Sequence, residues 1–185
     1  WGGDILRIAN YVTDAGAYNS DPTKFRNLID ELVDICGNLG VYCIIDWHIL
    51  KPGDPNYVGY SGAKDFFTYM ASKHGKKPHV LFEICNEPNS VGLNATTYMI
   101  TWDSIRRYAI PVIDEIRKYS DNIIIVGTPN WSQNIDRAAA KPIDGKNIMY
   151  TFHFYVESHS SLKNTLKMNV SRLPVFVTEW GTCKS

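Results

Sequence analysis

The sequence predicts an α/β protein with a parallel sheet, and three observations support this fold class. Six short runs of apolar residues recur along the 185-residue chain, and each run is nearly continuous rather than alternating with polar residues. This pattern is typical of strands that are buried on both faces of a parallel sheet. Segments with helical periodicity separate the runs, and no linker or low-complexity stretch divides the chain. We therefore expect residues 1–185 to form a single domain.

The runs and the segments between them define the expected elements. The expected strands are Ile5–Ala9, Val41–Asp46, Val80–Cys85, Ile123–Gly127, Ile148–Phe152 and Pro174–Thr178. The expected helices are Lys24–Leu39, Ala63–Lys73, Trp102–Tyr119, Arg137–Ala140 and Leu162–Met168. Apolar residues recur every three or four positions in the first helix, and Gly40 is placed to end it. Pro111 lies inside the third helix and predicts a kink or a break there.

Composition and motifs exclude several classes of partner. Lys plus Arg and Asp plus Glu each number 19, so the formal net charge is 0 and no basic surface for nucleic acid is indicated. No apolar run approaches the roughly 20 residues of a membrane span. The sequence contains neither a Gly-x-Gly-x-x-Gly loop nor a phosphate-binding P-loop, and its four cysteines form no Cys-x-x-Cys pair. We therefore expect no nucleic-acid partner, no membrane partner and no cofactor.

Polar and aromatic side chains gather at the carboxyl ends of the expected strands. The first strand carries Arg7 and ends at Asn10 and Tyr11, and the later strands end at Asp46–His48, Asn86–Pro88, Pro129–Trp131, His153–Tyr155 and Glu179–Gly181. Carboxyl ends of parallel strands form the active-site face of a closed (β/α)8 barrel and the ligand face of an open doubly wound sheet. The sequence therefore predicts a site at this face.

Glu87 and Glu179 are the candidate catalytic residues. They follow strands that are far apart in the sequence, so across a barrel mouth they can face each other. Glycoside hydrolysis needs one protonated carboxyl group for the leaving oxygen and one carboxylate near the anomeric carbon. A single Glu at a strand end is commonly a surface or capping residue, but two such residues with Asn, His, Tyr and Trp beside them favour catalysis.

The neighbouring residues each have a structural alternative. Arg7 could pair with a core carboxylate, support the site, or do both. Trp131 and Trp180 could stack on a sugar or pack in the core. A metal site built from His48, His153 and a Glu is a further alternative, but no local ligand spacing such as His-Glu-x-x-His supports it.

Three histidines, His74, His79 and His159, lie away from the strand ends, and the first two are interpreted as surface residues. His74 and His79 have no polar or aromatic neighbours of the kind found at the strand ends.

The motifs at the strand ends resemble those of a known family. They are Asp46-Trp47-His48-Ile49-Leu50, Asn86-Glu87-Pro88-Asn89, Ile125-Val126-Gly127-Thr128, Trp131-Ser132-Gln133, His153-Phe154-Tyr155 and Val177-Thr178-Glu179-Trp180-Gly181. Together and in this order, they resemble glycoside hydrolase family 5, and most closely its bacterial-type endo-β-1,4-glucanases. The resemblance implies a (β/α)8 TIM barrel and a retaining double displacement.

The resemblance also implies roles for individual residues. Glu87 corresponds to the general acid/base and Glu179 to the nucleophile. Asn86 corresponds to the partner of the sugar 2-hydroxyl. Tyr155 and Arg7 correspond to the pair that keeps Glu179 ionised and oriented.

Five further residues are expected to bind or support the substrate. His48 and His153 resemble the histidines of the family that contact sugars and carboxylates. Trp131 resembles a stacking platform on the aglycone side, Tyr11 is expected on the glycone side, and Trp180 is included among the supporting residues.

The chain departs from the family pattern in its number of strands. Six strands are recognisable and resemble the second to seventh of the barrel, whereas a complete barrel has eight. We therefore expect an incomplete barrel of about six βα units, either a fragment of a longer enzyme or an open partial barrel. Missing strands or further modules are expected in the full-length protein.

The resulting functional prediction is a secreted, endo-acting retaining hydrolase that cleaves β-1,4-glucosidic bonds in cellulose or related β-glucans. A β-mannanase or xylanase of the same fold remains an alternative, as does a truncated carbohydrate-binding remnant without catalysis. The chain starts at Trp1 without a signal peptide, which suggests a mature or truncated product and is compatible with secretion.

Overall fold

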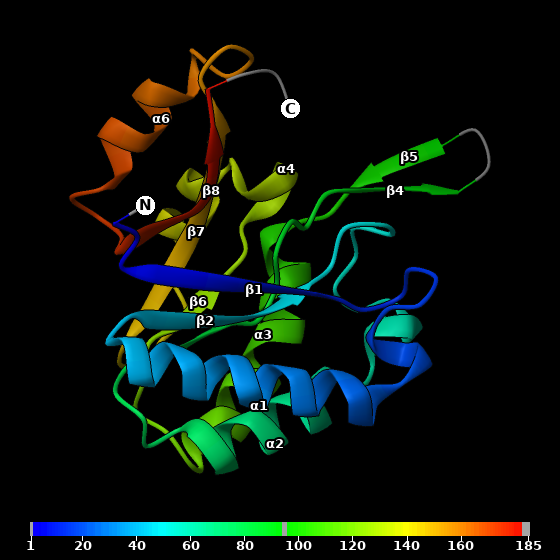
Figure 1. Ribbon diagram of the computed structural model, residues 1–185. Helices are drawn as coiled ribbons and strands as arrows, with labels where there is room; N and C mark the ends of the chain where they lie inside the picture. Colours follow the sequence, from blue (N-terminus) through cyan, green and yellow to red (C-terminus); the bar gives the residue numbers. More distant parts are fainter. Residues whose placement is uncertain (1, 94–95, 183–185) are drawn as a thin grey trace.

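The computed structural model describes residues 2–93 and 96–182, and its centre is a curved parallel sheet with helices on the outer face (Figure 1). The sheet consists of β1 (Ile5–Tyr11), β2 (Tyr42–His48), β3 (Val80–Glu83), β6 (Ile124–Val126), β7 (Ile148–Tyr155) and β8 (Val175–Gly181). Its strand order is β1-β2-β3-β6-β7-β8, and every neighbouring pair is parallel. All six expected strands are present, with ends that shift by at most three residues. Within the described residues, β1 and β8 each have a partner strand on one side only.

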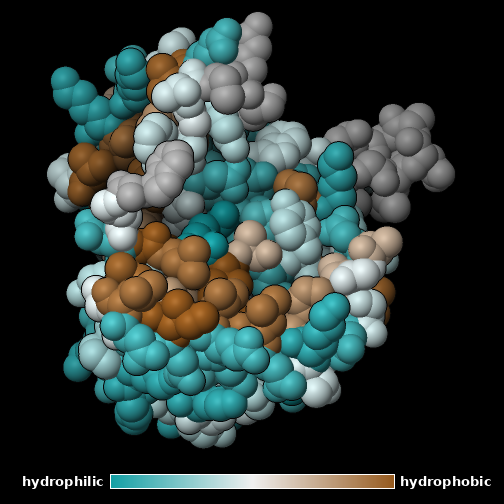
Figure 2. Space-filling model, in the orientation of Figure 1, coloured by the Kyte–Doolittle hydropathy of each residue, from teal (hydrophilic) through white to brown (hydrophobic). Residues whose placement is uncertain are grey.

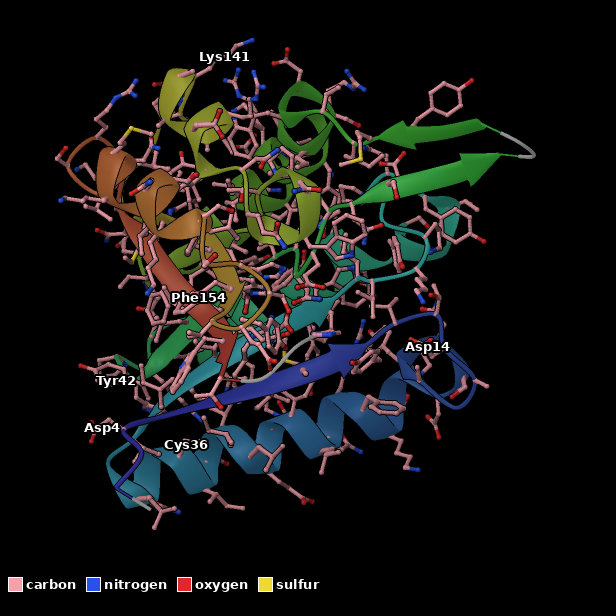
Figure 3. The ribbon with its side chains drawn as sticks, turned by 90° about the horizontal axis from the view of Figure 1, so that it is seen from above. Asp4, Asp14, Cys36, Tyr42, Lys141 and Phe154 are labelled. Carbon is pink, nitrogen blue, oxygen red and sulfur yellow. The ribbon has the colours of Figure 1, made fainter. Side chains whose placement is uncertain are left out.

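Helices connect the strands and cover one face of the sheet. They are α1 (Pro22–Leu39), α2 (Ala63–His74), α3 (Trp102–Arg117), α4 (Pro129–Ser132), α5 (Ile135–Ala140) and α6 (Leu162–Asn169), with short 3-10 turns at Tyr18–Ser20 and Val58–Tyr60. Figure 3 shows α1 lying along the outside of β1. No helix among residues 2–93 and 96–182 has the length and hydropathy to cross a bilayer.

The helix ends follow the local sequence. The Asp21 side chain accepts a hydrogen bond from Lys24 N at the start of α1, and Gly40 ends the helix in a left-handed conformation with φ of 69°. In α3 the expected break at Pro111 does not occur, because the helix runs without interruption from Trp102 to Arg117. Pro111 lies on the exposed side, where water can hydrate the carbonyl group that loses its helical partner.

A two-stranded ribbon was not expected from the sequence. β4 (Ser90–Leu93) pairs antiparallel with β5 (Thr96–Met99), and the ribbon projects from the body of the molecule in both Figure 1 and Figure 3. Each strand has four residues, which is too short for a clear alternating pattern in the sequence.

Apolar packing between sheet and helices forms the main core. Five aromatic rings from two strands, α2 and the turn before α1 are in contact there: Tyr18, Trp47, Phe66, Phe67 and Phe82. All five side chains are buried. This core holds the strands in register and so positions the polar residues at their carboxyl ends.

The inner face of the sheet changes from apolar to polar along the strands. Near the amino ends Ile44, Leu81 and Ile125 form a small buried cluster. Residues two apart on a strand share a face, so Asp46 and His48 follow Ile44 on the inner side of β2. Asp46 is in register with Glu83 of β3, which starts a polar layer above the apolar one.

The apolar layer is open to solvent between the two edges of the sheet. A cavity of about 400 Å³ is lined there by residues that include Ile5, Tyr42, Leu81 and Phe176. Figure 2 shows apolar surface over β1 and β2 at this level. The sheet is therefore part of a barrel wall whose interior is uncovered along one side.

Candidate active site

The two candidate carboxylates lie in one cavity at the carboxyl ends of the strands. The cavity has a volume of about 580 Å³ and is lined by Leu50, Lys51, Glu87, Asn130, Trp131, Gln133, His153, Tyr155, His159 and Glu179. One oxygen of Glu87, one oxygen of Glu179 and a ring nitrogen of His153 all lie within 4.8 Å of one another. The side chain of Glu87 is 13% exposed and that of Glu179 is 30% exposed, so both carboxylates reach the cavity from a largely buried position.

Arg7 is the central cation of the site. Its Nε lies 2.6 Å from Glu83 Oε2, and its Nη2 lies 3.0 Å from Asp46 Oδ2 and 2.7 Å from Asn86 Oδ1. Its Nη1 lies 3.2 Å from Glu179 Oε2. Burial lowers the pKa of Arg7, but the three carboxylates raise it by more, so the pKa lies above its ordinary value. Arg7 thus pairs with two core carboxylates and also contacts the candidate nucleophile.

Glu179 is held as a carboxylate by hydrogen bonds to both oxygens. Tyr155 donates its hydroxyl hydrogen to Oε1 at 2.7 Å, and Arg7 donates to Oε2. Although burial raises the pKa of Glu179, the Tyr155 hydrogen bond and the Arg7 guanidinium lower it below its ordinary value. An ionised carboxylate at the cavity wall is suited to act as a nucleophile.

Glu87 has a different environment. Its Oε1 lies 2.8 Å from Nδ1 of His153, and the other ring nitrogen of His153 lies 2.8 Å from Thr178 Oγ1. Thr178 donates in turn to Oε1 of Glu83 at 2.8 Å, and Thr151 donates to the same oxygen at 3.3 Å. Glu87 is thus connected through His153 to a group buried beneath the cavity.

A second histidine orients the amide of Asn86. The Asn86 Nδ2 group donates to Nε2 of His48 at 3.2 Å and to the carbonyl of Ile49 at 3.1 Å. His48 Nε2 is then an acceptor, so its Nδ1 carries the hydrogen that binds Asp46 Oδ2 at 2.6 Å. The Tyr11 ring packs 4.2 Å from the His48 ring, measured between centroids, at the rim of the site. His48 therefore positions Asn86, while Tyr11 lies against His48.

Trp131 reaches the cavity from a strained turn. Asn130, Trp131 and Ser132 have φ angles of 58°, 54° and 56°, so α4 is a left-handed turn in these residues. This conformation costs roughly 1–2 kcal/mol for each residue with a side chain. Trp131 N donates to the carbonyl of Pro88 at 3.0 Å, and Ser132 Oγ donates to the carbonyl of Asn86 at 2.7 Å. The strained turn is thus tied to the loop that carries Glu87 and leaves the Trp131 side chain 38% exposed.

Trp180 is the one predicted site residue that lies apart from the others in the described structure. It is 63% exposed and does not line the cavity. It is in register with Phe154 on β7, and Phe154 packs on the core from the helix side of the sheet. Since consecutive strand residues point to opposite faces, the inward direction of Glu179 directs Trp180 outward.

The surface interpretation of His74 is wrong. This side chain is buried between α1 and α2, and its Nε2 lies 2.5 Å from Oδ1 of Asp30. His79 is half-buried and its Nε2 bonds the carbonyl of Val33. Each histidine binds a group on the neighbouring helix α1, a tertiary contact without a local sequence signal.

Sequence reasoning missed Asp46, Glu83 and Thr178 as members of the site. The side chains of Asp46 and Glu83 are 0% exposed, and both bind Arg7. A usable signal existed, because each carboxylate stands inside an apolar strand run and a buried charge requires a partner. Thr178 gave no such signal, since a threonine in a strand is unremarkable.

Three residues of the cavity also have the chemistry to bind a divalent cation. Glu87, His153 and Glu179 each offer one ligand atom in the group described above. However, His153 uses both ring nitrogens in hydrogen bonds, and Glu179 uses both oxygens. The arrangement instead suits a proton donor and a nucleophile that face one reacting carbon.

Comparison with known proteins agrees with this geometry. Residues 1–185 match the family described as Cellulase (glycosyl hydrolase family 5). The chain is 42% identical to cellulase CelDZ1 of Thermoanaerobacterium sp, with 100% of this chain and 50% of that protein aligned. It is also 42% identical to endoglucanase E-5 of Thermobifida fusca, with 98% of this chain and 39% of that protein aligned.

Solved structures show the same fold. The catalytic domain of Thermobifida fusca endoglucanase Cel5A, crystallised in complex with cellotetraose, gives a TM-score of 0.86 at 41% identity and covers 97% of this chain and 58% of its own. The alkaline cellulase K catalytic domain gives a TM-score of 0.89 at 32% identity and covers 100% of this chain and 58% of its own. These matches confirm the predicted fold class, an incomplete (β/α)8 barrel.

The chain spans half or less of the length of the two curated relatives described above. The family match nevertheless covers every residue of it, and both candidate carboxylates lie in one cavity at the carboxyl ends of the barrel strands. The chain belongs to glycosyl hydrolase family 5.

Proposed function

We propose that the protein is a retaining endo-β-1,4-glucanase in which Glu87 is the acid/base and Glu179 the nucleophile. The observation that carries this proposal is the short separation between the two carboxylates, whose nearest oxygens lie within 4.8 Å. Retaining glycosidases have carboxyl groups about 5–5.5 Å apart, whereas inverting enzymes need roughly 6.5–9.5 Å to accommodate a water molecule. The endoglucanase names of the relatives and the cellotetraose complex of one related structure support a β-glucan as the substrate.

The proposed mechanism gives each group a role in two steps. In the first, Glu179 attacks the anomeric carbon while protonated Glu87 gives its proton to the leaving oxygen, so the glycosidic bond breaks and a glycosyl ester forms on Glu179. In the second, the Glu87 carboxylate takes a proton from water, and the water oxygen displaces Glu179 from the same carbon. The ester removes a negative charge from the cavity, which favours the carboxylate form of Glu87 in the second step.

The test is reducing-end release from carboxymethylcellulose by the full polypeptide that the gene encodes, with β-mannan and xylan as parallel substrates and with and without a chelator. We expect release from the glucan, unaffected by the chelator, and NMR of the first products should show the β-anomer. Faster release from mannan or xylan would reassign the substrate, and the α-anomer would reject retention. Binding of cellotetraose without release would identify a carbohydrate-binding remnant.

We also propose that the protein acts outside the cell, because a polymeric glucan cannot cross a membrane. Activity staining of culture medium and cell lysate from the source organism tests this, and activity confined to the lysate would reject it.

Tyr155→Phe should move the acid limb of the pH–kcat/KM profile to higher pH. The hydroxyl of Tyr155 is one of the groups that lower the pKa of Glu179, so its loss raises that pKa toward the ordinary value. Since Glu179 must be ionised to attack, more of the enzyme is inactive at a given low pH. The measurement is the pH profile with a soluble cello-oligosaccharide, and an unchanged acid limb would contradict this role for Tyr155.

A further inference from the structure

A chain of hydrogen bonds leads from Glu87 into the buried interior of the sheet. It runs from Glu87 Oε1 to Nδ1 of His153, from Nε2 of His153 to Thr178 Oγ1, and from Thr178 to Oε1 of Glu83. Each of the three links measures 2.8 Å between heavy atoms. Both ring nitrogens of His153 are therefore engaged, one toward the cavity and one toward the fully buried Glu83.

The inner end of this chain sets the direction of its hydrogen bonds. Arg7 Nε can only donate, and it lies 2.6 Å from Oε2 of Glu83. The remaining oxygen of Glu83 accepts from the hydroxyl of Thr178, which has a single hydrogen. With that hydrogen directed at Glu83, Thr178 Oγ1 is an acceptor toward the imidazole.

The direction fixes the tautomer of the histidine. Because Thr178 Oγ1 accepts, His153 carries its hydrogen on Nε2, and Nδ1 of the neutral ring is an acceptor. Nδ1 faces Oε1 of Glu87, so the hydrogen in that bond comes from the carboxyl group of Glu87. Glu83, at the buried end of this chain of hydrogen bonds, thus determines whether Glu87 or His153 holds the proton at the cavity.

We propose that Thr178 and Glu83 are positioning residues that hold His153 in the Nε2–H tautomer, so that Glu87 retains the proton it delivers to the leaving oxygen. This inference rests on the proposed function, because it concerns the acid step of that hydrolysis. Neither residue touches the substrate in this mechanism, and both act through His153.

Other ionisable groups border this chain of hydrogen bonds. Arg7 from β1 binds its inner member Glu83, and the remaining groups are Asp46 and His48 from β2, Tyr155 from β7 and Glu179 from β8, with Lys51 and His159 lining the same cavity. Glu179 is bound by Arg7 and Tyr155, and His48 is bound by Asp46. These groups therefore leave both ring nitrogens of His153 to Glu87 and Thr178.

A pair of threonine variants in the full polypeptide separates positioning from structure. Thr178→Val removes the hydroxyl between His153 and Glu83, whereas Thr151→Val removes a hydroxyl that also donates to Glu83 Oε1, at 3.3 Å, without lying on the path to His153. The side-chain change is the same in both, and both hydroxyl groups lie within hydrogen-bonding distance of Glu83 Oε1. Circular dichroism verifies that each variant folds.

Two substrates distinguish the proton-delivery step from the rest of catalysis. Cellotetraose has a sugar alkoxide leaving group that needs a proton, whereas 2,4-dinitrophenyl β-cellobioside releases a weakly basic phenolate that needs none. For Thr178→Val we expect kcat/KM on cellotetraose to fall about 10-fold, part of the 10²–10⁴ that a general acid contributes, and kcat/KM on the aryl substrate to stay within about 2-fold. The basic limb of the cellotetraose profile should also move to lower pH. Thr151→Val should match the wild type on both substrates.

The tautomer itself is read from the ring nitrogen shifts of His153 in ¹⁵N-histidine-labelled protein, assigned with a His153→Gln variant. We expect hydrogen on Nε2 in the wild type. In Glu83→Gln, Arg7 Nε still donates to the amide oxygen, so the amide NH₂ group faces Thr178 and donates to its hydroxyl oxygen. Thr178 then donates its own hydrogen to Nε2 of His153, which reverses the direction of these hydrogen bonds. His153 should then carry its hydrogen on Nδ1.

Hydrogen on Nδ1, or on both ring nitrogens, in the wild type would overturn the inference. The inference would also be overturned if Thr178→Val lowered kcat/KM equally on both substrates. The same holds if Thr151→Val lowered kcat/KM on cellotetraose as much as Thr178→Val does. A wild type that hydrolyses neither substrate but shows the Nε2–H tautomer would reject the proposed function while supporting the hydrogen-bond direction.

Discussion

Glu179→Gln should reduce the release of reducing ends from carboxymethylcellulose by at least about 10⁴-fold, the loss typical of removing a covalent nucleophile. The amide has the same shape as the carboxylate but cannot form the glycosyl ester. Arg7 can still donate to the amide oxygen, and the amide NH₂ group can donate to the hydroxyl oxygen of Tyr155, so the fold and the cavity should persist. Binding of cellotetraose measured by calorimetry should therefore remain while turnover is lost.

The matched control for this variant is Glu157→Gln. Glu157 is exposed in the loop after β7 and does not line the cavity. The control makes the same change of charge on the same side of the molecule, and its activity should equal that of the wild type. Activity of Glu179→Gln above about 1% of the wild-type value would remove Glu179 from the role of nucleophile.

Arg7→Met should destabilise the protein by roughly 3–5 kcal/mol and abolish most of the activity, because it leaves buried carboxylates without their cation. The side chains of Asp46 and Glu83 are 0% exposed, so water cannot replace the guanidinium. Glu179 loses its Nη1 partner in the same variant. Urea unfolding of the full polypeptide measures the stability change, and reducing-end release measures the activity.

The destabilisation by Arg7→Met should depend on pH in a defined direction. Burial and the Asp46 carboxylate raise the pKa of Glu83 in the native protein, and Arg7 opposes this rise. Without Arg7 the folded state binds a proton that the unfolded state releases, so stability falls as pH rises above the ordinary range of a glutamate. The decrease in the free energy of unfolding caused by Arg7→Met should therefore be smaller at acidic pH than at neutral pH.

Arg26→Met provides the control for Arg7. Arg26 pairs with Asp65 at 2.6 Å, but the Asp65 side chain is 79% exposed, and a pair of this kind contributes about 0–1 kcal/mol. If Arg7→Met were as stable as Arg26→Met, the buried carboxylates would not depend on Arg7.

The sequence predicts the six strands and most of the helices because their signals are local. Continuous β-branched runs indicate buried parallel strands, and residues such as Asp21 and Gly40 act on their immediate neighbours at helix ends. The β4–β5 ribbon could not be predicted in this way, since four-residue strands contain too few positions to show a period. A break at Pro111 does not occur, because its exposed position on α3, which depends on tertiary packing, lets water compensate the lost hydrogen bond.

For the active site, the sequence by itself determined the family and the two candidate carboxylates, because motifs at strand ends share one edge of a parallel sheet. Only the tertiary structure decided how these carboxylates differ. Glu179 meets Arg7 across 172 positions of sequence and Tyr155 across 24, whereas Glu87 meets His153. The tertiary structure likewise turned Trp180 outward and joined Thr178 to Glu83 across 95 positions of sequence. Such contacts arise where non-neighbouring strands face one interior, and no local pattern records which side chains will meet there.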